Sequence, residues 1–215
     1  MVAPAAYDRL VRVASEHILV AAGKAPKDPD VGGALSEIRA AIGHVVWPPG
    51  SSEFTIYPES GKKRGEGNGV VPIKRAFVST LQSMGWDLER KFPVETEPDQ
   101  RNFGAIDASK VFGESLVSVE WETGNISSSH RAVNKMAVGL LEGALSAGVL
   151  VVPTVALARY LTDRIGNLAE LKPYFRLWET APIENGLLMV IAVEHDSESK
   201  DVPRIRKGTD GRSLE

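Results

Sequence analysis

The chain has 215 residues, of which 43% are hydrophobic and 25% are charged, and its formal net charge is -3. This length and composition are ordinary for a globular protein and predict a single α/β domain with a sizeable core. No apolar run approaches the roughly 20 residues that a membrane-spanning helix needs, and the absence of cysteine excludes disulfides and thiolate zinc sites. We therefore expect a cytoplasmic protein without a membrane partner.

The first third of the chain is predicted to be mainly helical. Apolar residues at helical spacing indicate a helix over about residues 5–22 and a second one over about 34–45. These two helices form an N-terminal helical part of the domain, about residues 1–50. A polar, glycine-rich loop follows over about residues 51–69. The next helix, over about residues 72–84, has a proline in its first turn and a clear apolar stripe.

The rest of the chain is predicted to mix strands with helices. Its elements follow in this order: a strand over 86–92, the start of a strand at 104–107, a turn at 112–115, a strand over 117–122, a helix from about 128 to 146, a strand over 149–152, helices over 156–165 and 167–177, and a strand over 186–193. This order predicts a central mixed β-sheet with helices packed on its faces. No linker divides residues 1–215 into two domains.

The most informative segment is Val117-Ser118-Val119-Glu120-Trp121-Glu122. Successive strand residues face opposite sides, so Glu120 and Glu122 are expected to be neighbours, with Asp107 on the adjacent strand. Like charges this close raise each other's pKa unless a cation lies between them, and Mg²⁺ prefers oxygen ligands of this kind. Two acids at this spacing are also common on a solvated strand face, and the spacing alone favours that reading.

The order of these motifs resembles the PD-(D/E)XK nucleases. Ile106-Asp107 is followed by Val119-Glu120-Trp121-Glu122-Thr123-Gly124-Asn125 and by a serine-rich entry to a helix. This pattern is most similar to type II restriction endonucleases of the BglII, BamHI and BstYI branch. The resemblance covers about residues 68–135 well, and residues 164–167 and 208–212 more loosely. It implies a restriction-endonuclease-like fold with the PD-(D/E)XK core.

The resemblance also implies roles for the acidic residues. Asp107 and Glu120 would bind Mg²⁺ with the help of the backbone carbonyl of Trp121. Glu122 takes the position held by Lys in most of the superfamily, and it would orient or deprotonate the attacking water. A carboxylate beside a metal is a weak base, which leaves the identity of the general base open. The long spacing between Asp107 and Glu120 makes Glu114 a rival ligand if the turn at 112–115 does not form.

Contacts to double-stranded DNA are expected after the acidic cluster. Asn can donate to and accept from adenine, and Arg can pair with guanine. By resemblance, Asn125 is the first candidate for a base contact, and Arg164 and Asn167 are weaker candidates that could instead serve as a helix cap or a surface ion pair. The expected DNA-binding set is Asn125, Ser127, Ser128, Arg131, Arg164 and Asn167.

The resulting hypothesis is an Mg²⁺-dependent type II restriction endonuclease that acts as a homodimer on a short palindromic site and leaves 5′-phosphates. The helix over 128–146 is the first candidate for the dimer interface. A repair or structure-specific nuclease with the same core is the nearest alternative. A DNA-binding protein that does not cut is a second one. A glycosidase that uses Glu120 and Glu122 lacks an obvious sugar platform.

Overall fold

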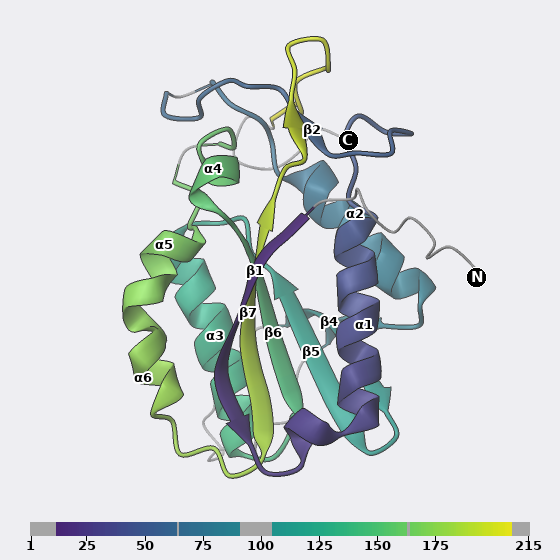
Figure 1. The fold of residues 1–215 in the computed structure, drawn as a ribbon, viewed down its shortest axis with the longest axis vertical. Coiled ribbons are helices and arrows are strands. Elements are labelled where there is room, and N and C mark those ends of the chain that lie inside the picture. Colours follow the sequence, from purple (N-terminus) through teal and green to yellow (C-terminus); the bar gives the residue numbers. More distant parts are fainter. Residues whose placement is uncertain (1–11, 64, 91–104, 163, 208–215) are drawn as a thin grey trace, which may run out of the picture.

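A computed structural model of the protein describes residues 12–63, 65–90, 105–162 and 164–207. Its centre is a six-stranded sheet in the order β1-β7-β6-β5-β4-β3 (Figure 1). β5, β6 and β7 are parallel to one another, whereas the pairs β1–β7, β4–β5 and β3–β4 are antiparallel. The predicted mixed sheet is therefore confirmed. The strands are β1 (Arg12–Ala22), β3 (Asp87–Arg90), β4 (Ile106–Phe112), β5 (Ser115–Trp121), β6 (Ala147–Pro153) and β7 (Gly186–Glu194).

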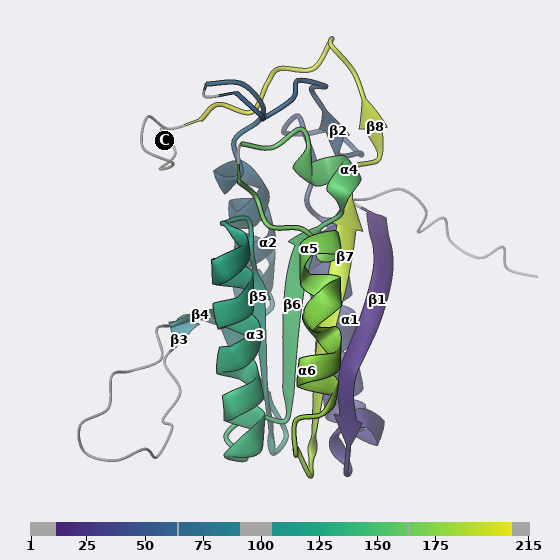
Figure 2. The same ribbon diagram turned by 90° about the vertical axis from the view of Figure 1, so that its left-hand side faces the viewer.

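Helices cover both faces of the sheet, as Figure 2 shows. α1 (Pro29–Gly43) and α2 (Val71–Ser83) pack on one face. α3 (Ile126–Leu141), α5 (Leu168–Leu171) and α6 (Phe175–Glu179) pack on the other face. Each face of the sheet has its own cluster of buried side chains. The α/β class with helices on both faces is thus confirmed, and the sheet separates two hydrophobic cores.

The central strands form where the sequence is most apolar. Every residue of β6 and β7 is buried, as expected for parallel strands that are covered on both faces. β5 is also central, and its residues Val117, Val119 and Trp121 enter the core beneath α1 and α2. The predicted alternation along β5 is therefore correct for these apolar side chains.

The predicted helix over 5–22 is wrong for its described part, because Arg12–Ala22 form the edge strand β1. Along β1 the exposure of successive residues alternates, and the strand pairs antiparallel with β7 from Arg12↔Glu194 to Ala22↔Gly186. β-Branched residues such as Val13 and Val20 suit a pleated surface. Pairing with a strand more than 160 positions away supplies hydrogen bonds that local periodicity does not reveal. The N-terminal part of the domain is consequently not all helical.

The two helices predicted over 156–165 and 167–177 are shorter and interrupted. α4 spans only Val155–Ala158, and α5 is followed by a 3₁₀ turn, Lys172–Tyr174, before α6. The carbonyls of Arg159 and Tyr160 accept backbone N–H groups from the loop over residues 51–69 rather than from a following helical turn. Tertiary hydrogen bonds therefore replace the expected helix.

The other helix predictions are confirmed within a few residues by α1, α2 and α3. The polar loop over 51–69 contains one short strand, β2 (Thr55–Ile56), which pairs in parallel with β8 (Ser197–Glu198). Within the described ranges, no helix has both the length and the apolar character to cross a membrane.

Candidate active site

The acidic residues of the site gather where β4 and β5 meet. Ala108 pairs with Val119 across these strands, which places Asp107 beside Glu120 at the end of the hairpin. The Asp107 carboxylate accepts the backbone N–H of Trp121 at 2.9 Å through Oδ2. Its Oδ1 lies 2.7 Å from Nζ of Lys74, a residue of α2. The Asp107 side chain is therefore held by one contact from the sheet and one from α2.

Glu120 is the most enclosed of the acids, with a side chain 9% exposed. Its Oε1 lies 2.5 Å from Nζ of Lys135, which also donates to the backbone carbonyl of Ala105 at 2.7 Å. The pKa of Glu120 is raised from 4.5 to about 7, first by burial and then by the negative charge of Asp107, against the opposing effect of Lys135 and Lys74. The two acids are therefore close enough to repel one another.

Glu122 follows directly after β5. Its backbone N–H donates to the carbonyl of Val151 on β6, and its Oε1 accepts the backbone N–H of Gly124 at 2.6 Å. Burial raises the pKa of this carboxyl, while the Gly124 N–H and the positive charge of Lys74 oppose the increase. Glu122 therefore shares the electrostatic surroundings of Asp107 and Glu120, and its raised pKa favours proton acceptance.

The donor set suits a hard cation. Among the described residues, no three side chains of His, Cys, Asp or Glu lie close enough together to enclose a metal ion. Mg²⁺ is usually held by only one or two carboxylates and keeps several waters, so it does not require such a cage. Asp107 and Glu120 repel each other and are compensated here by lysines, and their oxygens are the ligand type that Mg²⁺ prefers. These residues fit a Mg²⁺ ion.

The turn expected at residues 112–115 forms in the structure. β4 and β5 form a hairpin in which Phe112 pairs with Ser115, and Gly113 has φ +56°. Glu114 therefore lies in the turn at the start of β5, whereas Glu120 lies near the end of that strand. The condition under which Glu114 would replace Asp107 is not met.

The candidate DNA-binding residues are brought to one region by a contact between two loops. The N–H of Gly166 donates to the carbonyl of Gly124 at 2.9 Å, which joins the loop before α5 to the N-terminus of α3. Asn125 caps α3 by accepting the N–H of Ser128 at 3.1 Å, and Asn167 caps α5 by accepting the N–H of Ala169 at 3.1 Å. The cap that was one reading of Asn167 is confirmed. Ser127, Arg131 and Arg164 are exposed in this region.

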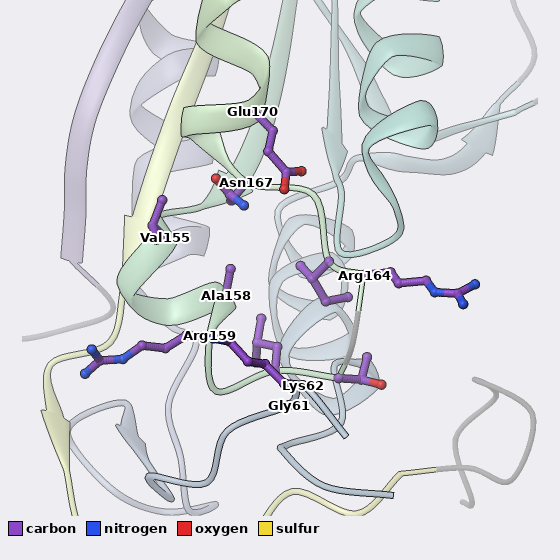
Figure 3. A pocket seen from close by; sticks show the side chains of 11 residues that line it. Gly61, Lys62, Val155, Ala158, Arg159, Arg164, Asn167 and Glu170 are labelled. Atoms are coloured by element: carbon purple, nitrogen blue, oxygen red, sulfur yellow. The ribbon is translucent and has the colours of Figure 1, made fainter. Parts of the chain in front are cut away.

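A cavity of about 550 Å³ opens beside these loops (Figure 3). Lys62, Arg159 and Arg164 contribute basic side chains to its lining, and Glu170 contributes a carboxylate. Asn167 and several apolar side chains also belong to the lining. In Figure 3 the Arg159 and Arg164 side chains extend outward in different directions. The lining of the cavity is therefore mixed, with basic, acidic and apolar side chains, and it lies beside the loop that contacts the N-terminus of α3.

Two lysines of the site were missed by the sequence reasoning. Lys135 lies on the buried face of α3 between Ala132 and Met136, so a charged residue within an apolar stripe was the available signal. Lys74 follows Ile73 at the start of α2, and nothing in its spacing connects it with Asp107. Only the packing of α2 against the sheet reveals this lysine.

The family model described as "Restriction endonuclease BamHI" matches residues 11–212. The type II restriction enzyme OkrAI of Oceanobacter kriegii is 43% identical over 197 residues, which cover 92% of this chain and 96% of that protein. The type II restriction enzyme BamHI of Bacillus amyloliquefaciens is 36% identical over 192 residues, which cover 87% and 85%.

A solved structure of restriction endonuclease BglII with a DNA 16-mer aligns over 57% of this chain and 55% of its own, at 11% identity and a TM-score of 0.43, and that likeness is too weak to support a conclusion. The family model and both relatives, in contrast, extend over almost the whole chain. The chain therefore belongs to the BamHI restriction endonuclease family and is a type II restriction endonuclease.

Proposed function

We propose that this enzyme is a cytoplasmic, Mg²⁺-dependent homodimer that hydrolyses both strands of DNA at a short palindromic site and leaves 5′-phosphates and 3′-hydroxyls. The observation that carries the proposal is the convergence of Asp107 and Glu120 at the end of one hairpin, where burial and mutual repulsion raise the pKa of Glu120 to about 7. A divalent cation would relieve this repulsion. The cysteine-free sequence is compatible with a reducing compartment.

The acidic residues would have different roles in the reaction. Asp107, Glu120 and the backbone carbonyl of Trp121 would hold the Mg²⁺ ion. When bound, the ion lowers the pKa of water and offsets charge on the phosphate oxygens. Glu122 would orient the attacking water, and its raised pKa supports a role as proton acceptor. The Gly124 N–H that binds Glu122 would keep the carboxylate pointed at the site.

Sequence recognition would come from the two joined loops. Asn125 caps α3, Ser127 and Ser128 lie in its first turn and Arg131 lies in its second, and the N-terminus of such a helix favours a phosphate. The hydrogen bond between Gly166 and Gly124 holds the loop of Arg164 and Asn167 beside the N-terminus of α3, which supports a role for both residues in DNA binding. Asn125 and Asn167 already use their side-chain oxygens as caps, so the amide NH₂ groups are the donors that would contact bases.

A two-fold dimer suits a palindromic target, because a symmetric site presents the same bases to both protomers. The layer of α3 and α6 is our candidate interface. Exposed apolar residues on this side include Leu141 of α3, Leu177 of α6 and Tyr174 of the 3₁₀ turn that precedes α6, and they are 45%, 67% and 49% exposed. Trp178 donates to Asn134 at 2.8 Å, which joins the two helices into one surface. We expect Leu177→Lys to shift the mass measured by light scattering from dimer to monomer, and Val111→Lys, on the exposed part of β4, to leave it unchanged.

The central experiment uses unmethylated plasmid and phage DNA with Mg²⁺ or with EDTA. Wild-type protein is compared with Glu120→Gln and with Glu184→Gln, an exposed acid that lies before β7, at the opposite end of the parallel strands. We expect discrete Mg²⁺-dependent fragments from the wild type and from Glu184→Gln, and none from Glu120→Gln. Sequencing the ends gives the site and the position of the phosphate.

Other outcomes would refute parts of the proposal. A smear instead of discrete fragments would favour a repair or structure-specific nuclease. Unchanged cleavage by Glu120→Gln would move the active site elsewhere. DNA that stays intact with several metals and substrates, but is bound, would indicate a DNA-binding protein that does not cut.

A further inference from the structure

Two lysines neutralise the acidic residues, and they come from opposite sides of the sheet. Lys135 belongs to α3 and contacts Glu120, whereas Lys74 belongs to α2 and contacts Asp107. Their surroundings differ. The side chain of Lys135 is 7% exposed, and that of Lys74 is 39% exposed. One cation is thus enclosed within the protein, and the other can be reached by a group that enters from solvent.

The contacts of Lys135 hold it in place. Its Nζ donates to Glu120 at 2.5 Å and to the backbone carbonyl of Ala105 at 2.7 Å. Moving it outward would break both bonds and leave two acceptors without this donor, which is unfavourable in a buried position. Lys135 is therefore a fixed counter-charge for Glu120, and it is poorly placed to follow a reacting group.

Lys74 is in a different situation. It meets Asp107 at 2.7 Å with an ammonium at the end of a flexible four-carbon stem. Its positive charge acts on Glu120 and Glu122 as well as on Asp107. It therefore lies among the three acids, and its exposed fraction leaves it free to exchange one anionic partner for another.

We propose that Lys74 is a catalytic residue that changes partner during the reaction, from Asp107 in the free enzyme to a non-bridging oxygen of the scissile phosphate in the complex. This inference rests on the proposed active site. A cation bound by Asp107 would replace the ammonium, and the ammonium would move to the incoming phosphate. Donors fixed at a phosphate act on the charge that develops in the transition state.

The role of Lys74 in this step is electrostatic. The oxygen of water forms a new bond to phosphorus while the bond from phosphorus to the 3′ oxygen breaks. One water proton is released to solvent by way of Glu122, and the 3′ oxygen gains one proton. Lys74 keeps its three protons throughout and stabilises the phosphate oxygens.

The test measures single-turnover cleavage of a duplex that carries the site mapped with the wild-type enzyme, over a range of Mg²⁺ concentrations. The variants are Lys74→Met, Lys74→Arg and the control Lys27→Met, an exposed lysine in the 3₁₀ turn Ala25–Lys27 beside the start of β7. We expect Lys74→Met to lower the rate at saturating Mg²⁺ about 100-fold. Lys74→Arg should retain a rate within about tenfold of the wild-type rate, because arginine keeps the positive charge at this position. The control should cleave normally.

A structural role predicts a different pattern. If Lys74 only neutralises Asp107, its removal ends a competition with the metal, so Lys74→Met should reach the wild-type rate at a lower Mg²⁺ concentration. That result would overturn the inference. Melting temperature and DNA binding in EDTA check folding. If Lys74→Met does not fold, Lys74→Gln, which can still donate to Asp107, replaces it.

The failure of the inference is distinguishable from the failure of the proposed site. Glu120→Gln is assayed in parallel. If it is inactive while Lys74→Met cleaves at the full rate, only the role of Lys74 is wrong. If Glu120→Gln cleaves like wild type, the active site itself has been misplaced.

Discussion

The buried pair of Lys135 and Glu120 offers a stability measurement in which pH separates two contributions. Replacing Lys135 with Met removes the donor of Glu120 and of the Ala105 carbonyl, at similar side-chain volume. Loss of the bond to the carbonyl costs about 1 kcal/mol at any pH. Loss of the bond to Glu120 costs more when this carboxyl is ionised, because a buried charge then loses its cation.

The size of the second contribution follows from the pKa of Glu120. In the folded wild type this pKa is about 7, compared with an ordinary value of 4.5, so the folded state holds a proton that the unfolded state has released. The free energy of unfolding therefore falls as pH rises from 4.5 to about 7, and it levels off above 7 when both states are ionised. Without Lys135 the pKa of Glu120 rises further, so the fall continues. Each unit by which the pKa of Glu120 rises further lowers the free energy of unfolding above that pKa by about 1.4 kcal/mol.

We therefore expect Lys135→Met to destabilise the protein by about 1 kcal/mol at pH 6 and by about 2 kcal/mol at pH 8. The measurement is urea denaturation in EDTA at pH 6, 7 and 8 and at one fixed protein concentration, since dimerisation would contribute to stability. In the background of Glu120→Gln, the same substitution should have a cost that no longer grows with pH.

Lys110→Met is a matched control. Lys110 also bonds a carboxylate, that of Glu37 at 2.9 Å, and a backbone carbonyl, that of Met84 at 2.8 Å, but this pair is more exposed, with side-chain fractions of 22% and 29%. A cost of Lys135→Met that stays constant from pH 6 to 8, or that grows no more than the cost of Lys110→Met, would refute the reasoning about Glu120.

Further substitutions test the close packing at a glycine, the cap of α3 and a surface ion pair. A Cβ on Gly61 would lie 1.5 Å from the carbonyl oxygen of Leu161, so Gly61→Ala should lower the free energy of unfolding by about 2 kcal/mol in urea titrations, whereas Gly32→Ala, in an open position of α1, should raise it by about 0.5–1 kcal/mol. Asn125→Ala should lower the free energy of unfolding by about 1 kcal/mol, because the α3 cap is lost. Asn125→Asp should keep the cap and the melting temperature but should weaken binding to the cognate duplex. Equal binding by the Asp variant would exclude a base contact by the amide. Arg39→Ala removes a partly exposed ion pair between α1 and β1, and it should lower the free energy of unfolding by less than about 1 kcal/mol. A larger loss would contradict the expectation that solvent screens this ion pair.

The sequence by itself determined the elements whose pattern is local. The apolar runs of β6 and β7, the alternation of β5 and the stripe of α3 are each contained within a single element, because burial on a sheet or helix face follows the period of that element. The turn before Ser115 and the asparagine caps are likewise set by neighbouring residues. The order of the acidic motifs was enough to indicate the family.

The tertiary structure decided whatever depends on partners far apart in the chain. Arg12–Ala22 became a strand because β7 supplies its hydrogen bonds, and the helix expected after Val155 stops early because the loop over 51–69 donates to the carbonyls of Arg159 and Tyr160. The pairing of Lys74 with Asp107 and of Lys135 with Glu120 depends on two helices that approach the sheet from opposite faces. Periodicity records which face of an element is buried, but it carries no information about which distant side chain lies against that face.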